Sequence, residues 1–454
     1  MELLNRQFVK EAIYSEKVLQ FGTGVLLRGL PDYFIEKANR AGLFEGSIAV
    51  VKSTDSGNLD QFERQDNMYT IHIKGLESGR DVQEVLTVSA ISRVIAAASD
   101  WDTILGIARN PALQIVISNT TEVGIILDEQ DKLFGSPPVS FPGKLTAVLF
   151  ERFQAFNGAE NRGLVILPTE LIDKNGERLQ DIVIALAQRN QLGVEFINWV
   201  KNSNHFCNTL VDRIVPGSLG IAERIQAESQ LGYKDELAIM VEPFCLWAIE
   251  SAHPRVSEVL SFTQVDSRAI ITHNIEKFKE LKLRLLNGSH TFACGLALLA
   301  GFETVRESMA DPIFLAYVRR LMHKEIIPTL LETEINRKEA EAFADEVIYR
   351  FSNPYLHHQW QSISANYTSK MQLRNLATLQ RYYKKGKSKV ADYMALGFAG
   401  YLRVAGHMES RDLLALWENE LRPLGDFLPT VERYVIQLQQ REVLAVIQDL
   451  DRDE

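Results

Sequence analysis

Short apolar runs alternate with longer amphipathic stretches in the first part of the chain. Residues 18–21 predict a strand, residues 26–41 a helix and residues 47–51 a second strand, which together have the length of one right-handed βαβ unit. Later runs that predict strands lie at 81–95, 114–118 and 163–167. This alternation predicts an α/β domain with a Rossmann-like, doubly wound sheet that is mostly parallel.

The second half of the chain has a different pattern. From about residue 274 the strand signals fade and long helical periods appear, at 340–351, 389–403 and 431–451. Residues 241–249 are compatible with a last strand of the first domain. We therefore predict a Rossmann-like domain in residues 1–272, followed by an all-helical substrate and catalytic domain in residues 273–454.

The composition of the 454 residues excludes several classes of protein. A formal charge of −10 gives no overall field that would attract nucleic acid or an anionic membrane. Three widely spaced cysteines, Cys207, Cys245 and Cys294, predict neither a disulfide framework nor a Cys-rich zinc site, and they favour a reducing compartment. The first residues lack a secretory pattern, and no apolar stretch reaches the ~20 residues needed to cross a bilayer. We expect a soluble, cytoplasmic protein whose partner is a small molecule.

A glycine turn follows the first predicted strand. Gly22-Thr23-Gly24 precedes a predicted helix, a position where glycines let backbone N–H groups approach a pyrophosphate. The full dinucleotide fingerprint has a third glycine where this chain has Leu27. The motif alone therefore fits a tight turn without a ligand equally well.

Polar residues at the ends of two other predicted strands are also compatible with a bound dinucleotide. Asp55 comes later than the ribose-binding position requires, and Lys52 fits either a ribose phosphate or the surface, which leaves NAD and NADP open. The segment 118–122 either faces a nicotinamide or caps a helix. The expected cofactor contacts are Phe21, Gly22, Thr23, Gly24, Val25, Ser53, Asn119, Thr120 and Glu122.

The predicted helical domain begins with a segment that contains Lys282, Asn287 and His290. In an α-helix, at about 100° per residue, Asn287 lies ~140° and His290 ~80° from Lys282 in the same sense, so the three can converge on one cleft. Reduction of a ketone by hydride needs a proton for the developing alkoxide and a donor that stabilises its charge, which an ammonium and an amide can supply. His290 would hydrogen-bond the reacting oxygen or a neighbouring hydroxyl. The spacing by itself also fits a solvated helix face.

The chain resembles the polyol-specific long-chain dehydrogenase (mannitol dehydrogenase) family nearly from end to end. The family pattern K-x-x-x-x-N-x-x-H matches Lys282, Asn287 and His290. Two further shared segments are Asn208-x-x-Val211-Asp212-Arg213-Ile214 and Glu242-Pro243-Phe244 with Trp247. The resemblance implies NAD as cofactor, Lys282 as general acid and base, and no metal.

The resemblance also implies a substrate class. Residues 21–29 and 167–172 are similar to those of members that reduce D-tagaturonate to D-altronate in hexuronate breakdown, with fructuronate reduction or mannitol oxidation as alternatives. Leu171 stands where the mannitol enzymes have a second oxyanion-binding asparagine, and Ser362 where they have a pocket arginine. A hexuronate carboxylate requires a cationic or N–H-rich pocket end. The expected substrate contacts are Asp212, Arg213, Lys370 and Arg374, although each cation also fits an ordinary ion pair.

Three other classes fit the chain less well. A zinc alcohol dehydrogenase needs Cys and His ligands at a spacing that the chain lacks, and His357-His358 fits a structural or substrate-contacting loop better than a metal pair. In β-hydroxyacid dehydrogenases the catalytic lysine and asparagine usually stand one turn apart, whereas five residues separate Lys282 from Asn287. A sensor that kept the fold and lost the chemistry is disfavoured by the intact lysine, asparagine and histidine set.

Overall fold

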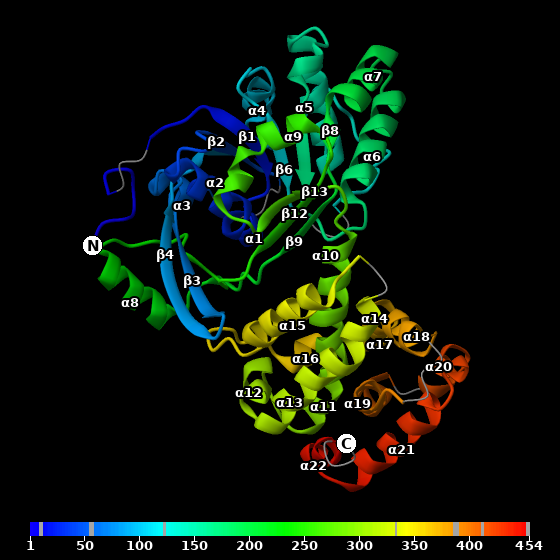
Figure 1. Cartoon of the computed structure of the whole chain (residues 1–454). Coiled ribbons are helices and arrows are strands. Elements are labelled where there is room, and N and C mark those ends of the chain that lie inside the picture. The colour runs from blue at the N-terminus through cyan, green and yellow to red at the C-terminus, as the bar shows by residue number, and fades with distance from the viewer. Residues whose placement is uncertain are drawn as a thin grey trace. The chain divides into compact units, whose positions relative to one another are not determined.

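The computed structural model describes residues 1–8, 12–53, 59–120, 124–331, 334–384, 390–409 and 413–450. The chain forms two compact units (Figure 1). Unit 1 comprises Met1–Lys74 and Gln83–Ile275, and unit 2 comprises Gly75–Val82 and Glu276–Glu454.

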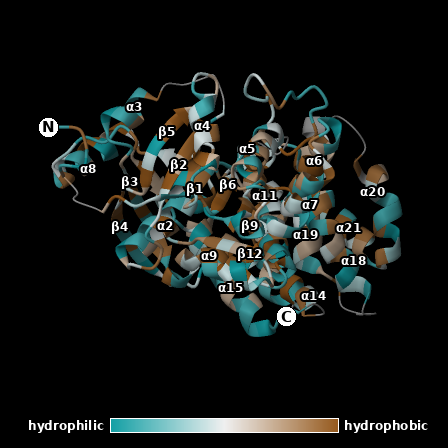
Figure 2. Ribbon diagram, turned by 90° about the horizontal axis from the view of Figure 1, so that it is seen from above, coloured by the Kyte–Doolittle hydropathy of each residue, from teal (hydrophilic) through white to brown (hydrophobic). Residues whose placement is uncertain are grey.

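Unit 1 is built on a six-stranded parallel sheet. Neighbouring strands follow the order β5-β2-β1-β6-β7-β8. This is the strand order of a dinucleotide-binding doubly wound fold. The strands are β1 (Glu16–Phe21), β2 (Ser47–Lys52), β5 (Ile91–Ala96), β6 (Ile115–Ser118), β7 (Val165–Pro168) and β8 (His205–Phe206). Figure 2 shows β2 and β5 mainly in the colour of hydrophobic residues. The predicted fold class of the first domain is confirmed.

Helices enclose the core of this sheet. Four of them share one hydrophobic core with strand residues such as Leu19 and Val116: α4 (Trp101–Ala108), α5 (Phe141–Ala155), α6 (Asn175–Arg189) and α7 (Val194–Ser203). Elsewhere in the unit, Phe34 packs on Trp247, which stacks on Phe262. Unit 1 also contains α3 (Asp60–Arg64), η1 (Glu160–Arg162), α8 (Ile221–Leu231), α9 (Pro254–Val259) and η2 (Ser261–Val265).

Two smaller sheets complete the strand inventory of the described residues, in the orders β10-β11-β3-β4 and β13-β12-β9. Their strands are β3 (Tyr69–Glu77), β4 (Arg80–Val88), β9 (Thr209–Asp212), β10 (Gly217–Ser218), β11 (Ile239–Val241), β12 (Leu246–Glu250) and β13 (Ala269–Thr272). The predicted strand 81–95 is thus two strands in different sheets, and the predicted strand 241–249 also divides between two sheets.

The predicted helix 26–41 is interrupted. It forms α1 (Val25–Gly29) and α2 (Pro31–Arg40), with Leu30 between them. Pro31 has no N–H for a helix interior but suits the first position of a new helix, so the chain restarts there.

Helices make up the body of unit 2, as predicted for the second domain. They are α10 (Glu276–Leu281), η3 (Lys282–Gly288), α11 (Ser289–Leu299), α12 (Val305–Ala310), α13 (Pro312–Arg320), η4 (Leu321–Ile326), α14 (Ile327–Leu330), α15 (Arg337–Phe351), α16 (Trp360–Ile363), α17 (Tyr367–Met371), η5 (Gln372–Leu376), α18 (Ala377–Lys384), α19 (Asp392–Glu409), α20 (Leu413–Leu421), η6 (Arg422–Leu424), α21 (Phe427–Gln440) and α22 (Val443–Asp449). Three of these segments, η3, η4 and η5, are π-helical turns.

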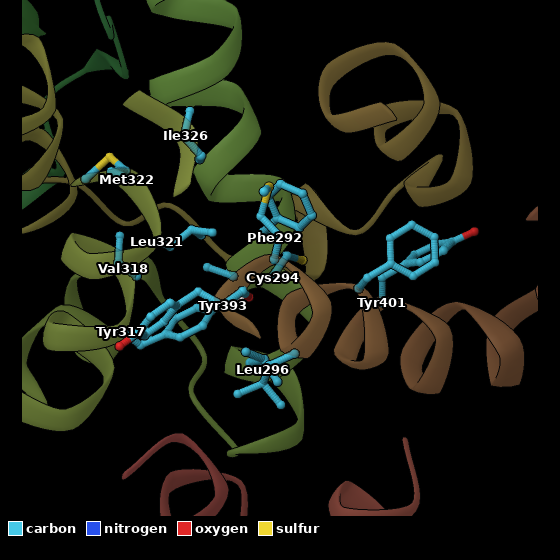
Figure 3. Close-up of a cluster of buried hydrophobic side chains, with 14 of the residues drawn as sticks. Phe292, Cys294, Leu296, Tyr317, Val318, Leu321, Met322, Ile326, Tyr393 and Tyr401 are labelled. Carbon is cyan, nitrogen blue, oxygen red and sulfur yellow. Dashed lines mark hydrogen bonds between the residues drawn. The ribbon is translucent and has the colours of Figure 1, made fainter. Parts of the chain in front are cut away.

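Helices α11 and α19 pack backbone to backbone in the core of unit 2. A Cβ atom added at Gly295 would overlap the backbone of Gly400, so neither helix has room for a larger residue at the contact. Around it lie the buried Phe292 and Leu296 of α11, and Tyr317 of α13 donates a hydrogen bond to the Tyr393 carbonyl at 3.0 Å (Figure 3). The contact fixes the axis of α11, which begins beside the candidate catalytic residues.

Every helix of the described residues is too short or too polar to span a bilayer. Cys207, Cys245 and Cys294 are buried free thiols.

Candidate active site

In the glycine turn of unit 1, the backbone at Gly22 lies close to neighbouring residues, whereas the space beside Gly24 is open. Gly22 has φ +126°, and its N–H donates to the Val51 carbonyl at 3.0 Å. A Cβ at Gly22 would lie 2.9 Å from the Leu27 side chain and 3.1 Å from the Asn119 carbonyl. Leu27 therefore fills the space that a third glycine would leave open. Gly24, in contrast, is exposed and has no atom within 4 Å of its Cβ position.

Ser53 follows β2, at the strand end where the ribose of a dinucleotide is expected. Its Oγ atom is buried and has no hydrogen-bond partner among the described residues. A buried hydroxyl usually has a partner, so a ligand hydroxyl fits this position. Asp55 lies outside the described residues.

Asn119 and Thr120 lie at the carboxyl end of β6, next to the end of β7. The Asn119 amide donates to the Thr169 hydroxyl at 3.0 Å, and both the N–H and the hydroxyl of Thr120 donate to Glu170 at 2.9 Å. Burial raises the pKa of Glu170. Glu170 is not among the predicted site residues, although its position just after a buried strand is a signal in the sequence. Glu122 lies outside the described residues.

Lys282 and Asn287 belong to the π-helical turn η3 in unit 2, and both are half-buried. A π-helix has hydrogen bonds between residues five apart, so Asn287 returns near the side of the helix that Lys282 occupies. In a regular α-helix these two residues would be ~140° apart around the axis. Such π-turns occur frequently at functional sites.

His290 is buried in the first turn of α11, with 7% of its surface exposed. Its ring centroid lies 4.9 Å from Phe351, 4.9 Å from Trp360 and 5.0 Å from His358. The Nε2 atom of His290 is buried and has no hydrogen-bond partner in the described parts of the chain. This nitrogen is therefore suited to a ligand hydroxyl.

The charge state of His290 follows from its surroundings. Burial, and then the positive potentials of His358, Arg374 and Lys370, hold the pKa of His290 well below its usual value. The imidazole is therefore neutral near pH 7. A neutral His290 can exchange hydrogen bonds with a substrate but cannot supply an acidic proton at that pH.

An ion-pair network holds the start of η3. Glu280 accepts from Arg284 at 3.2 Å and from Arg381, while Arg284 also donates to the Arg374 carbonyl at 2.7 Å. The Thr291 hydroxyl donates to the Asn287 carbonyl at 2.7 Å. The Arg284 contact joins η3 to η5, and the Arg381 contact joins α10 to α18. Sequence spacing gave no signal for these two contacts because their partners are about 90 to 100 residues apart.

The four predicted substrate contacts lie in different units. Lys370 and Arg374 belong to α17 and η5 of unit 2, beside His290. Asp212 and Arg213 are buried in unit 1. Arg213 donates to the carbonyls of Glu242 and Gly29 at 3.0 and 2.7 Å, and its guanidinium lies over a tyrosine ring.

The described residues contain no group of three or more His, Cys, Asp or Glu side chains arranged to hold a metal ion.

Two family models match the chain: the mannitol dehydrogenase Rossmann domain over residues 16–259 and the mannitol dehydrogenase C-terminal domain over residues 274–413. The chain therefore belongs to the mannitol dehydrogenase family and is an oxidoreductase, as the sequence motifs predicted.

Similar relatives include two bacterial enzymes. The altronate oxidoreductase of Bacillus subtilis (strain 168) is 38% identical over 86% of this chain and 79% of the relative. The altronate oxidoreductase of Klebsiella pneumoniae (strain 342) is 40% identical over 84% of this chain and 78% of the relative.

Two solved structures share the fold. Substrate-free D-sorbitol dehydrogenase has a TM-score of 0.80 at 20% identity and covers 98% of this chain and 100% of its own. The mannitol 2-dehydrogenase of Pseudomonas fluorescens, in a ternary complex with NAD and D-mannitol, has a TM-score of 0.71 at 21% identity and covers 100% of both chains.

Proposed function

We propose that the chain is an NAD-dependent altronate oxidoreductase, which interconverts D-altronate and D-tagaturonate. The observation that carries the proposal is the identity of 37% to 40% with altronate oxidoreductases over 84% to 96% of the chain. The buried, uncharged His290 and the two cations beside it add chemical support, because they suit a substrate with both hydroxyls and a carboxylate.

NAD as the cofactor is supported by the shape of unit 1. A dinucleotide at the carboxyl ends of the strands fits the restricted Gly22, the open space at Gly24 and the Ser53 hydroxyl, which has no hydrogen-bond partner within the described part of the chain. The same residues, with Asn119 and Thr120 at the end of β6, are the ones that we propose hold it. A bound nicotinamide would supply hydride to the carbonyl carbon, or accept it in the reverse direction.

We assign the proton transfer to Lys282. In reduction its ammonium gives a proton to the carbonyl oxygen as that oxygen becomes an alkoxide, and in oxidation the neutral amine takes the hydroxyl proton. The amide N–H of Asn287 donates a hydrogen bond to the same oxygen and stabilises its developing charge. His290, being neutral, orients a substrate hydroxyl through its uncommitted Nε2 atom.

We place the reaction in the cytoplasm, which three free, buried thiols support. The substrate is a small sugar acid.

Initial rates with a set of ketone substrates test the function. The purified chain should oxidise NADH fastest with D-tagaturonate, more slowly with D-fructuronate and slowest with D-fructose, and it should reduce NAD with D-altronate. Parallel assays with NADPH test the cofactor. Faster turnover of fructuronate or fructose would overturn the substrate assignment, and no turnover of any of them would favour a sensor.

A further inference from the structure

Two cations lie side by side in unit 2. Lys370 and Arg374 are four residues apart, a spacing that places side chains on neighbouring parts of one helix face. The Lys370 Nζ atom donates to the Ile363 carbonyl at 2.8 Å, and the Arg374 Nη1 atom donates to the Thr291 hydroxyl at 3.2 Å. In the described parts of the chain, neither cation forms an ion pair with a carboxylate.

The surroundings of Lys370 and Arg374 raise the free energy of the two charges when no anion is bound. Both side chains are half-buried. Burial and then the charge of Arg374 lower the pKa of Lys370, and burial lowers the pKa of Arg374. Two like charges taken partly out of water destabilise each other, and a bound anion would relieve both the repulsion and the lost hydration.

The pair is joined directly to the candidate catalytic turn. Thr291 accepts a hydrogen bond from Arg374 and donates one to the Asn287 carbonyl at 2.7 Å. Both cations also contribute to the potential at the buried His290 ring. An anion bound by Arg374 therefore lies within the reach of a small molecule whose other groups meet His290 and Asn287.

We propose that Arg374, with Lys370 beside it, binds the carboxylate of the substrate and makes the site select sugar acids over neutral polyols. The inference rests on the proposed function for the identity of the acid. A guanidinium can bind a carboxylate through two parallel hydrogen bonds, which an ammonium cannot do. A neutral polyol in the same position would leave both charges uncompensated, and the site would reject it for that reason.

A matched pair of substrates tests the selection. D-altritol differs from D-altronate in having a CH₂OH group in place of the carboxylate. Arg374→Gln should lower kcat/KM for D-altronate by roughly 30-fold or more, mostly through KM, while the low rate with D-altritol stays nearly unchanged. Arg374→Lys should recover part of the loss. Lys384→Gln removes an exposed cation at the end of α18 and should change neither rate.

A structural role for Arg374 predicts a different result. Thr291→Val removes the hydroxyl that Arg374 contacts but leaves both cations in place. It should slow both substrates alike and keep their ratio. If Arg374→Gln also slows both substrates alike, with the ratio unchanged, the proposal is wrong. Thermal unfolding of each variant shows whether the fold is intact.

Binding to the NADH complex separates this proposal from the proposed function. D-altronate cannot be oxidised by NADH, so calorimetry can measure its affinity without turnover. If the wild type does not oxidise D-altronate with NAD, the proposed function fails. The Arg374 proposal still holds if Arg374→Gln weakens D-altronate binding by a similar factor, and it fails if the wild type and the variant bind D-altronate equally or if neither binds it.

Discussion

At the scale of single residues, Lys282 is the strongest test of the proposed chemistry. Lys282→Ala should lower kcat by about 10²- to 10⁴-fold, because proton transfer is lost while the glycine turn and Ser53 of unit 1 are unchanged. NADH affinity, measured by fluorescence titration, should stay near the wild-type value. Lys279→Ala removes a lysine that pairs with Glu276 three residues away and should leave kcat unchanged. An unaltered kcat in Lys282→Ala would exclude its assigned role.

The residues of the candidate site were predictable to the extent that they form local motifs. Lys282, Asn287 and His290 follow one another within nine positions, and the glycines follow one strand. The contacts of Glu170 with Thr120 and of Glu280 with Arg381 join residues far apart in the sequence, and no local spacing indicates such contacts. The proximity of Lys370 and Arg374 to His290 likewise depends on the packing of distant helices.

At the scale of elements, the contact between α11 and α19 should control both stability and activity. Gly295→Ala places a methyl group against the Gly400 backbone and should destabilise unit 2 by about 1–3 kcal/mol or more. Because α11 carries His290, kcat/KM should fall as well. Gly406→Ala, on α19 with no atom near its Cβ position, should instead stabilise the helix slightly. Urea unfolding and initial rates of both variants measure the difference, and equal stabilities would contradict the packing argument.

Buried strands and long helices were largely predicted, and short irregular elements were not. The buried parallel strands form continuous apolar runs, and the long helices of unit 2 have a helical period, although the predicted helix 431–451 is divided between α21 and α22. Strands of two residues, such as β8 and β10, have too few positions for any pattern. The π-turn η3 differs from an α-helix only in its hydrogen-bond register, and its composition gave no sign of that. The break at Pro31 was visible in the sequence but was missed.

At the scale of the whole molecule, the division of the chain is not strictly sequential. Residues 75–82, the tip of the β3–β4 hairpin, belong to unit 2 although they lie early in the chain. Within unit 2 the Tyr355 hydroxyl donates to Asp81 at 3.2 Å, and the ring of Tyr349 lies near Gly79. A local hydrophobic pattern does not reveal contacts between residues more than 250 positions apart. The assignment of residues 75–82 to unit 2 could therefore not be predicted from the sequence.

The pH dependence of unfolding should be set in part by one buried carboxyl in unit 1. Asp32 accepts a hydrogen bond from the Tyr69 hydroxyl at 3.0 Å, and burial raises the pKa of Asp32 from 3.8 to about 7. Below about pH 4 the group is protonated in both the folded and the unfolded chain. Between about pH 4 and 7 only the folded chain keeps the proton, so the free energy of unfolding falls by roughly 4 kcal/mol as the pH rises, and above pH 7 this loss is constant.

Asp32→Asn keeps an acceptor for Tyr69 and removes the charge, so it should be more stable than the wild type at pH 8 and similar to it at pH 4.5. Hydrogen exchange of peptides from β1 and α2 reports unit 1 separately, and comparison of the two proteins at each pH cancels the intrinsic exchange rate. Asp60→Asn, at an exposed position, is the control and should follow the wild type. Parallel profiles for Asp32→Asn and the wild type would show that Asp32 is already ionised in the folded chain, in which case its neighbours Arg28 and Tyr69 stabilise the charge more than burial opposes it.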